Sequence, residues 1–130
     1  FGFFLGAAFQ IQDDVLNLVA DPVAYGKERL GDIREAKRTL TVIHCAAVAS
    51  PDERAWLEQV LATGFERSDD DVAQVVALME RHGSIAFARE FARGVAASAR
   101  AAFATAFAGT SGPGRDFVAA MISYMVDRAK

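Results

Sequence analysis

The sequence predicts an all-α protein, a bundle of about six helices, and three features of the chain support this fold class. The chain has 130 residues, is 52% hydrophobic and contains only three prolines. Alanine is frequent, and apolar residues recur at helical spacing rather than in the strict alternation of a half-buried strand. This length suffices for a modest core, so we expect residues 1–130 to form a single helical domain.

Residues 1–8 are apolar from the start of the chain. They lack the basic region and the cleavage site of a signal peptide. The stretch before Gln10 and Asp13 is also too short to cross a bilayer, so we expect no transmembrane segment. Because no polar cap precedes these residues, we expect the chain to begin inside a helix of a longer protein, as its C-terminal fragment. A natural half-length protein is the alternative.

The run Phe9–Asn17 continues this helix and carries the most informative pattern of the chain. At about 100° per residue, it places Gln10, Asp13, Asp14 and Asn17 on one stripe. No Lys or Arg lies three or four residues away to neutralise the carboxylates, as a surface helix would usually show. A solvated surface helix is the alternative. Adjacent carboxylates repel each other, and hard cations bind carboxylate oxygens, so the stripe predicts a divalent cation.

The stretch that follows this helix is basic and rich in turn signals. Lys27 and Lys37 flank Asp32 at equal spacing. Gly26 and Gly31 allow the backbone to bend and to approach a ligand closely. Carboxylates for a metal, followed by lysines for anionic oxygens, together predict a site for a metal-bound polyphosphate.

The next two predicted helices cover residues 39–49 and 50–63. The first is a nearly unbroken apolar run and is expected to be central, with His44 as a core or edge residue rather than a metal ligand. Ser50 followed by Pro51 and two acids is a helix start signal. The buried face of the second helix is expected to contain Trp56, Leu57, Val60 and Leu61.

The rest of the chain predicts helices over residues 68–82, 84–107 and from 115 onward. Ser68 and the three aspartates after it resemble a metal motif, but they also satisfy a helix start, and we favour that structural role. In the long helix over 84–107, phenylalanines recur at helical spacing, and we expect them to form its core face: Phe87, Phe91, Phe103 and Phe107.

Charge and cysteine content give no support for a nucleic-acid-binding protein or for a disulfide-stabilised one. A net charge of −3 gives no indication of nucleic-acid binding. The single cysteine, Cys45, excludes an internal disulfide framework and is consistent with a reducing cytoplasm. Because Cys45 lies in an apolar helical run, we expect a buried, inert thiol rather than a nucleophile.

The acidic stripe and the basic stretch together resemble the second aspartate-rich region of the trans-isoprenyl diphosphate synthases, or polyprenyl synthetases. The matching residues are Phe9-Gln10-x-x-Asp13-Asp14, Gly26-Lys27, Gly31-Asp32 and Lys37-x-Thr39. The chain departs from the family pattern at Asn17, where the last aspartate of the motif usually stands. The first aspartate-rich motif of the family has no counterpart in this sequence.

The resemblance implies the C-terminal half of the large isoprenyl-synthase helical bundle and assigns roles to individual residues. Asp13 and Asp14 would bind Mg²⁺, directly or through water, and Asn17 would do so more weakly. Lys27 would bind the allylic diphosphate. Gln10 would face the reacting carbon of the allylic substrate, and Phe9 would line the homoallylic pocket. Asp32 and Lys37 would support the end of the site that binds the diphosphate.

The implied function is prenyl transfer, in which an allylic diphosphate condenses with isopentenyl diphosphate to give a longer polyprenyl diphosphate. We expect the fragment alone to be inactive and the full-length protein to be a homodimer. A non-catalytic subunit that binds a catalytic prenyltransferase, and a purely structural helical module, are the alternatives. The sequence does not specify the product chain length.

Overall fold

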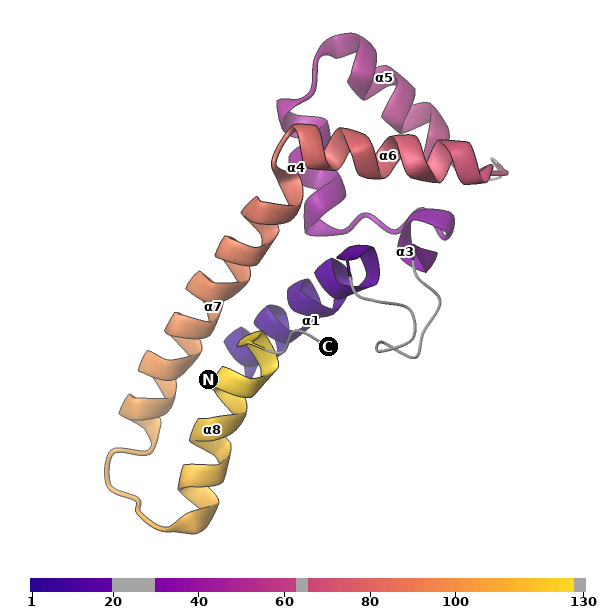
Figure 1. Ribbon diagram of the computed structural model, residues 1–130. Coiled ribbons are helices and arrows are strands. Elements are labelled where there is room, and N and C mark those ends of the chain that lie inside the picture. The colour runs from indigo at the N-terminus through magenta and orange to yellow at the C-terminus, as the bar shows by residue number, and fades with distance from the viewer. Residues whose placement is uncertain (20–29, 63–65, 128–130) are drawn as a thin grey trace.

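The computed structural model describes residues 1–19, 30–62 and 66–127 (Figure 1). It is all-α: the described residues form seven helices and no strand. The helices are α1 (Gly2–Val19), α3 (Gly31–Arg34), α4 (Leu40–Val48), α5 (Pro51–Val60), α6 (Asp69–Arg81), α7 (Ser84–Ala106) and α8 (Pro113–Asp127). The predicted fold class is therefore confirmed.

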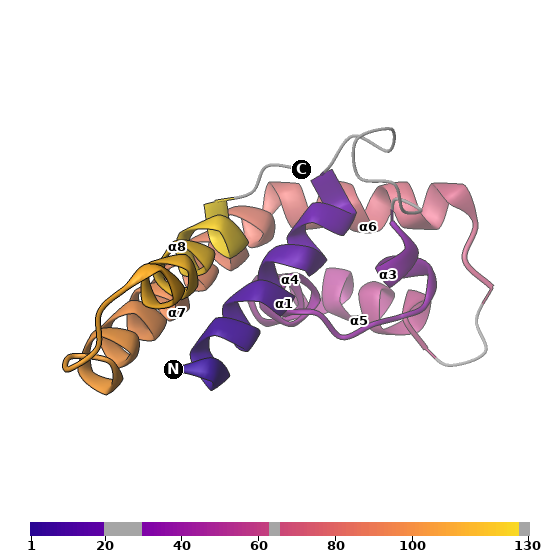
Figure 2. The same ribbon diagram turned by 90° about the horizontal axis from the view of Figure 1, so that it is seen from below.

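The long helix α7 connects two parts of the molecule. After the loop that follows α7, helix α8 folds back along it, and α1 lies beside both (Figures 1 and 2). Helices α3, α4, α5 and α6 gather at the other end of α7, close to the C-terminal end of α1. The largest buried cluster lies at this end and joins Val15 and Leu18 of α1 to residues of α3–α7.

The predicted core face of α7 is wrong at three of its four phenylalanines, because Phe107 is 37% exposed and Phe87 and Phe91 are exposed further. Phe87 and Phe91 are 40% and 48% exposed, and Phe87 stacks on His44 with ring centroids 4.0 Å apart. The fully buried line of α7 consists instead of small residues: Ala88, Ala92, Ala96 and Ala99. Because these side chains end at Cβ, α1 can approach α7 closely, and the buried Ala8 of α1 packs against Ala96.

Helix α4 is less central than its apolar sequence predicts. Val42 and Cys45 are buried, whereas Ile43 and Val48 are 55% and 47% exposed. The helix packs against α5, α6 and α7, which cover only part of its circumference. The prediction of a buried, inert thiol is confirmed, since burial also raises the pKa of Cys45.

Three of the predicted helix starts are confirmed, and the last helix begins at Pro113, two residues before its predicted start. Thr39, Ser50 and Ser68 are the N-caps of α4, α5 and α6, and the last two form capping boxes with the residue three positions later. Hydrogen bonds from Ser68 lower the pKa of the Asp71 carboxyl. Asp71 therefore serves the helix start, and Asp69 forms an ion pair with Arg34 of α3.

Candidate functional site

One side of α1 carries the acidic stripe, and the opposite side packs on α7. Val15 and Ala8 are fully buried, whereas Gln10 is exposed and Asp13 and Asp14 are partly exposed. The Gln10 side-chain amide donates a hydrogen bond of 2.8 Å from Nε2 to Oδ1 of Asp14, one helical turn further on. This hydrogen bond fixes the orientation of the Asp14 carboxylate.

Asn17 joins the stripe to the segment that follows it. The side chain is only 7% exposed, and its Oδ1 accepts a hydrogen bond of 3.2 Å from the backbone N–H of Asp32. The backbone carbonyl of Asn17 also accepts a 3.0 Å hydrogen bond from the backbone N–H of Leu30. These contacts hold the start of α3 against the end of α1. A metal ligand role for Asn17 stays a prediction, and any direct bond from its oxygen would compete with the Asp32 hydrogen bond.

The basic segment lies beside the acids, with its backbone bent at both ends of α3. Leu30 and Ala36 have φ values of 66° and 55°, in the left-handed region that residues other than glycine seldom adopt. The sequence predicted that Gly31 would allow the backbone to bend here. The left-handed residue before α3 is instead Leu30, and Gly31 is the first residue of the helix. The Cβ of any other residue at position 31 would lie 4.0 Å from the Asn17 amide, an ordinary contact.

Lys37 and Asp32 form an ion pair, and their role in a diphosphate site stays a prediction. The Lys37 Nζ lies 2.6 Å from Oδ1 of Asp32 and 3.0 Å from Oε2 of Glu35. Hydrogen bonds to these two carboxylates raise the pKa of Lys37, so the ammonium stays charged across the physiological range. Two carboxylates therefore balance the charge of the Lys37 ammonium.

The environment of Asp14 disfavours the ionised form of its carboxyl group. Burial raises the pKa of Asp14, and the nearby charges of Asp32 and Asp13 raise it further. The hydrogen bond from Gln10 and the charge of Lys37 act in the opposite direction, but the net shift is upward. Partial burial, more than the neighbouring charges, therefore disfavours the ionised form of Asp14.

A divalent cation fits this arrangement. Nowhere in residues 1–19, 30–62 and 66–127 do three His, Cys, Asp or Glu side chains gather closely enough to hold a metal ion. Mg²⁺, however, is typically held by one or two carboxylates together with substrate phosphates, and Asp13 and Asp14 supply oxygens of that kind. Both carboxylates are partly exposed on the side of α1 that carries Gln10, so their oxygens remain accessible.

The structure brings together four of the predicted site residues: Gln10, Asp14, Asp32 and Lys37. Asp13 lies next to them on α1, and Phe9 is half-buried one residue before Gln10. Lys27 falls outside the described residues, and its role stays a prediction. The sequence did not reveal the contact between Asn17 and the backbone of Asp32, because that contact joins segments that only the fold brings together.

The Asp14→Asn substitution is expected to raise the Tm of the free protein by a few degrees at neutral pH. The folded pKa of Asp14 lies above the unfolded value, so ionisation favours the unfolded chain as pH rises through the folded pKa. The gain should therefore vanish at low pH, where the wild-type carboxyl is protonated. Thermal melts between pH 3 and pH 7 measure it, and a variant less stable than wild type at neutral pH would contradict it. Asp70→Asn, in the first turn of α6, is the control and should not raise the Tm.

His44 has a structural role in the described part of the chain. Its Nδ1 lies 3.0 Å from the hydroxyl of the fully buried Ser84, and its ring stacks on Phe87. These contacts connect α4 to the start of α7. The expectation that His44 is a core or edge residue is confirmed.

Every helix in the described ranges is too short or too polar to traverse a lipid bilayer.

Comparison with known proteins identifies relatives along the whole length of the chain. A family model described as polyprenyl synthetase matches residues 1–79. The chain is 30% identical over 129 residues to a geranylfarnesyl diphosphate synthase of Aeropyrum pernix, covering 99% of this chain and 39% of that protein. It is 37% identical over 92 residues to a short chain isoprenyl diphosphate synthase of Methanothermobacter thermautotrophicus, covering 71% of this chain and 27% of that protein.

The fold agrees with a solved structure of the same kind. The crystal structure of a geranylgeranyl pyrophosphate synthetase from Pyrococcus horikoshii superposes with a TM-score of 0.78 at 28% identity, covering 96% of this chain and 36% of that chain. The chain therefore spans between about a quarter and two fifths of the length of these relatives.

Proposed function

Because the chain belongs to the polyprenyl synthetase family, we propose that it supplies the second aspartate-rich half of a prenyltransferase site. In the complete site, an allylic diphosphate condenses with isopentenyl diphosphate to give a longer polyprenyl diphosphate. The relatives named above are isoprenyl diphosphate synthases, and they are longer than this chain. The proposal is therefore that residues 1–130 act together with a further helical segment.

One observation supports this proposal above the others. Asp14, held by Gln10, faces the Asp32–Lys37 ion pair closely enough that the charges of both residues shift its pKa. The carboxylates and the ammonium are thus adjacent, as a site for a metal-bound diphosphate requires. A purely structural helical module would not require Asp14 to be partly buried beside Asp32, where its ionised form is disfavoured.

The residues of the chain bind and orient the leaving group in this proposal. When bound, Mg²⁺ supplies positive charge to the diphosphate as the allylic carbon–oxygen bond breaks. Asp13 and Asp14 hold the cation, and Gln10 keeps the Asp14 carboxylate oriented. Lys27 binds the phosphate oxygens, and the Lys37 ammonium adds charge at the same end.

The apolar half of the same helix face suits the hydrocarbon part of the substrate. Phe3 is 82% exposed, and a Cβ added at Gly6 would meet no atom within 4 Å. Both residues precede Gln10 on the side of α1 that faces away from α7. This face of α1 is therefore apolar before Gln10 and anionic after it. A metal-bound prenyl diphosphate likewise has an apolar chain at one end and a charged group at the other. Exposed apolar surface of this kind is typical of a site that another segment or ligand covers.

We place the active assembly in the cytoplasm and expect it to be a homodimer of the complete protein. The chain alone is expected to show no turnover with labelled isopentenyl diphosphate and an allylic diphosphate. It should nevertheless bind pyrophosphate in a Mg²⁺-dependent manner, which calorimetry measures. Clear turnover by residues 1–130 would contradict the need for a second half.

The longer protein that carries this segment provides the complementary measurement. It should form polyprenyl diphosphate products that mass spectrometry detects. Products formed only after a separate catalytic chain is added would instead support a non-catalytic subunit. Absence of Mg²⁺-dependent pyrophosphate binding by either protein would contradict the site itself.

A further inference from the structure

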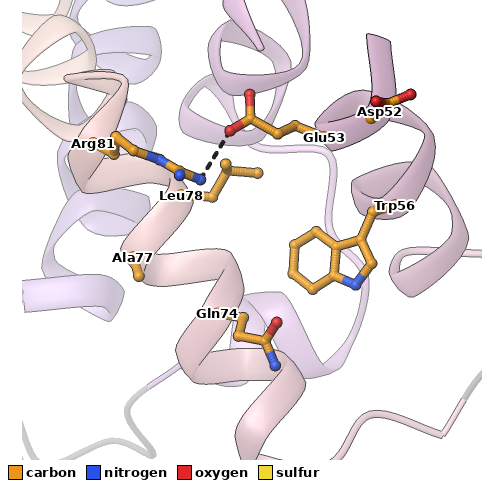
Figure 3. A pocket seen from close by; sticks show the side chains of 7 residues that line it. All are labelled: Asp52, Glu53, Trp56, Gln74, Ala77, Leu78 and Arg81. Carbon is orange, nitrogen blue, oxygen red and sulfur yellow. Dashed lines mark ion pairs between the residues drawn. The ribbon is translucent and has the colours of Figure 1, made fainter. Parts of the chain in front are cut away.

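A hollow between α5 and α6 lies outside the acidic stripe. It has a volume of about 570 Å³, which falls within the range of small-molecule sites. Figure 3 shows its lining, with residues from α5 on one side and residues from α6 on the other. The lining residues are Asp52, Glu53, Trp56, Gln74, Ala77, Leu78 and Arg81.

The apolar wall of the hollow is an aromatic ring. Trp56 is partly buried, and its indole extends from α5 toward α6, facing Gln74 and Ala77 (Figure 3). Leu78 is buried beneath the opening, and Ala77 is small and exposed. The partly exposed indole and the small Ala77 thus give the hollow an apolar wall.

The hollow is lined by more negative than positive side chains. The Arg81 guanidinium lies 2.9 Å from Oε1 of Glu53, and the other oxygen of Glu53 contacts His82 at 3.0 Å and the Ser50 backbone N–H at 2.9 Å. Both oxygens of Glu53 are therefore engaged, and its charge is balanced by Arg81. Asp52 adds a further carboxylate at the exposed rim, so the lining carries an excess of negative charge.

Asp52 and Trp56 are four residues apart on α5, and side chains at this spacing lie on the same helix face. We propose that the hollow binds a compact organic ammonium ion, with its cationic group between the Asp52 carboxylate and the Trp56 ring. An ammonium group is attracted by the negative face of an indole and by the carboxylate at once. The apolar part of the ligand lies over Ala77 and Leu78.

An anionic ligand is less compatible with the same lining. Among the described residues, Arg81 is the one cation that lines the hollow, and it is already paired with Glu53. An anion would also approach the Asp52 carboxylate and the C-terminal end of α6, both of which repel negative charge. This proposal does not depend on prenyl transfer, because none of the lining residues belongs to the acidic stripe.

Trp56 is the only tryptophan of the chain, so its fluorescence reports on this hollow alone. Titration of residues 1–130 with benzyltrimethylammonium should change the emission saturably in the millimolar range. Asp52→Asn should weaken the binding about fivefold, the effect of losing one exposed charge contact. Ala77→Leu should abolish the saturable change, because the larger side chain fills the space beside the indole.

A control variant and two probes without a positive charge test whether the hollow selects a cation. Glu58→Gln removes an exposed acid of the same helix that does not line the hollow, and it should leave the affinity unchanged. Benzoate and benzyl alcohol carry the same ring without the positive charge and should give no saturable change. Equal responses to the three probes, or an affinity that Ala77→Leu leaves intact in a variant with wild-type Tm, would overturn the proposal.

Discussion

Replacing Asp13 with Asn in the longer protein that carries this segment is expected to lower kcat by about 10²–10³, the effect of removing one preorganised electrostatic contact. The substitution removes a charge at nearly constant shape. Negative charge on the leaving diphosphate is greatest in the transition state, so the loss should fall on the chemical step rather than on substrate binding. Steady-state kinetics as a function of Mg²⁺ concentration measure the change.

The fold should survive this substitution. Asp13 lies on the side of α1 that faces away from α7, and removing one of two adjacent like charges opens no cavity. Glu58→Gln, on the outer surface of α5, is the control and should retain wild-type kcat. The reciprocal variant, Asn17→Asp, restores the usual carboxylate and should sharpen the Mg²⁺ dependence while it leaves or raises activity. A near-wild-type kcat for Asp13→Asn, combined with a lowered Tm, would make these carboxylates structural.

Ile33→Ala is expected to reduce the free energy of unfolding by about 2–5 kcal/mol, the range for truncating a buried isoleucine. Ile33 is 1% exposed and belongs to the largest core cluster, although α3 contains only four residues. A helix this short depends on the burial of its one core side chain, because its own hydrogen bonds cannot sustain it. Chemical denaturation of the variant and the wild type measures the loss.

Ile33→Ala also tests whether the core supports the diphosphate site. Asp32 directly precedes Ile33, and its backbone N–H is bonded to Asn17. Loss of the Ile33 anchor should therefore weaken Mg²⁺-dependent pyrophosphate binding at temperatures where the protein remains folded. Ile43→Ala removes the same atoms from an exposed position and should change stability by no more than about 0.5 kcal/mol. Equal losses of stability for the two variants would contradict the assignment of Ile33 to the core.

The sequence alone determined the features that depend on a few neighbouring residues. The starts of α5 and α6 were predictable from Ser50 and Ser68, because a capping box is formed within one turn of the chain. The shared face of Gln10 and Asp14 was predictable for the same reason, since helical periodicity fixes which residues lie on one side. The family resemblance was carried by the same local motif.

For α7, the tertiary structure decided which side of the helix is buried, whereas the buried Leu57 and Val60 of α5 were predictable. Phe87 and Ala88 are adjacent in sequence, yet α1 packs on the alanine side of α7 and leaves the phenylalanine exposed. Periodicity identifies an apolar face but does not specify which neighbour approaches it or how closely. The contact of Asn17 with the backbone of Asp32 is of the same kind, because it forms only when α3 returns to the end of α1. Burial and long-range hydrogen bonds depend on the packing partner, and the local sequence does not contain that information.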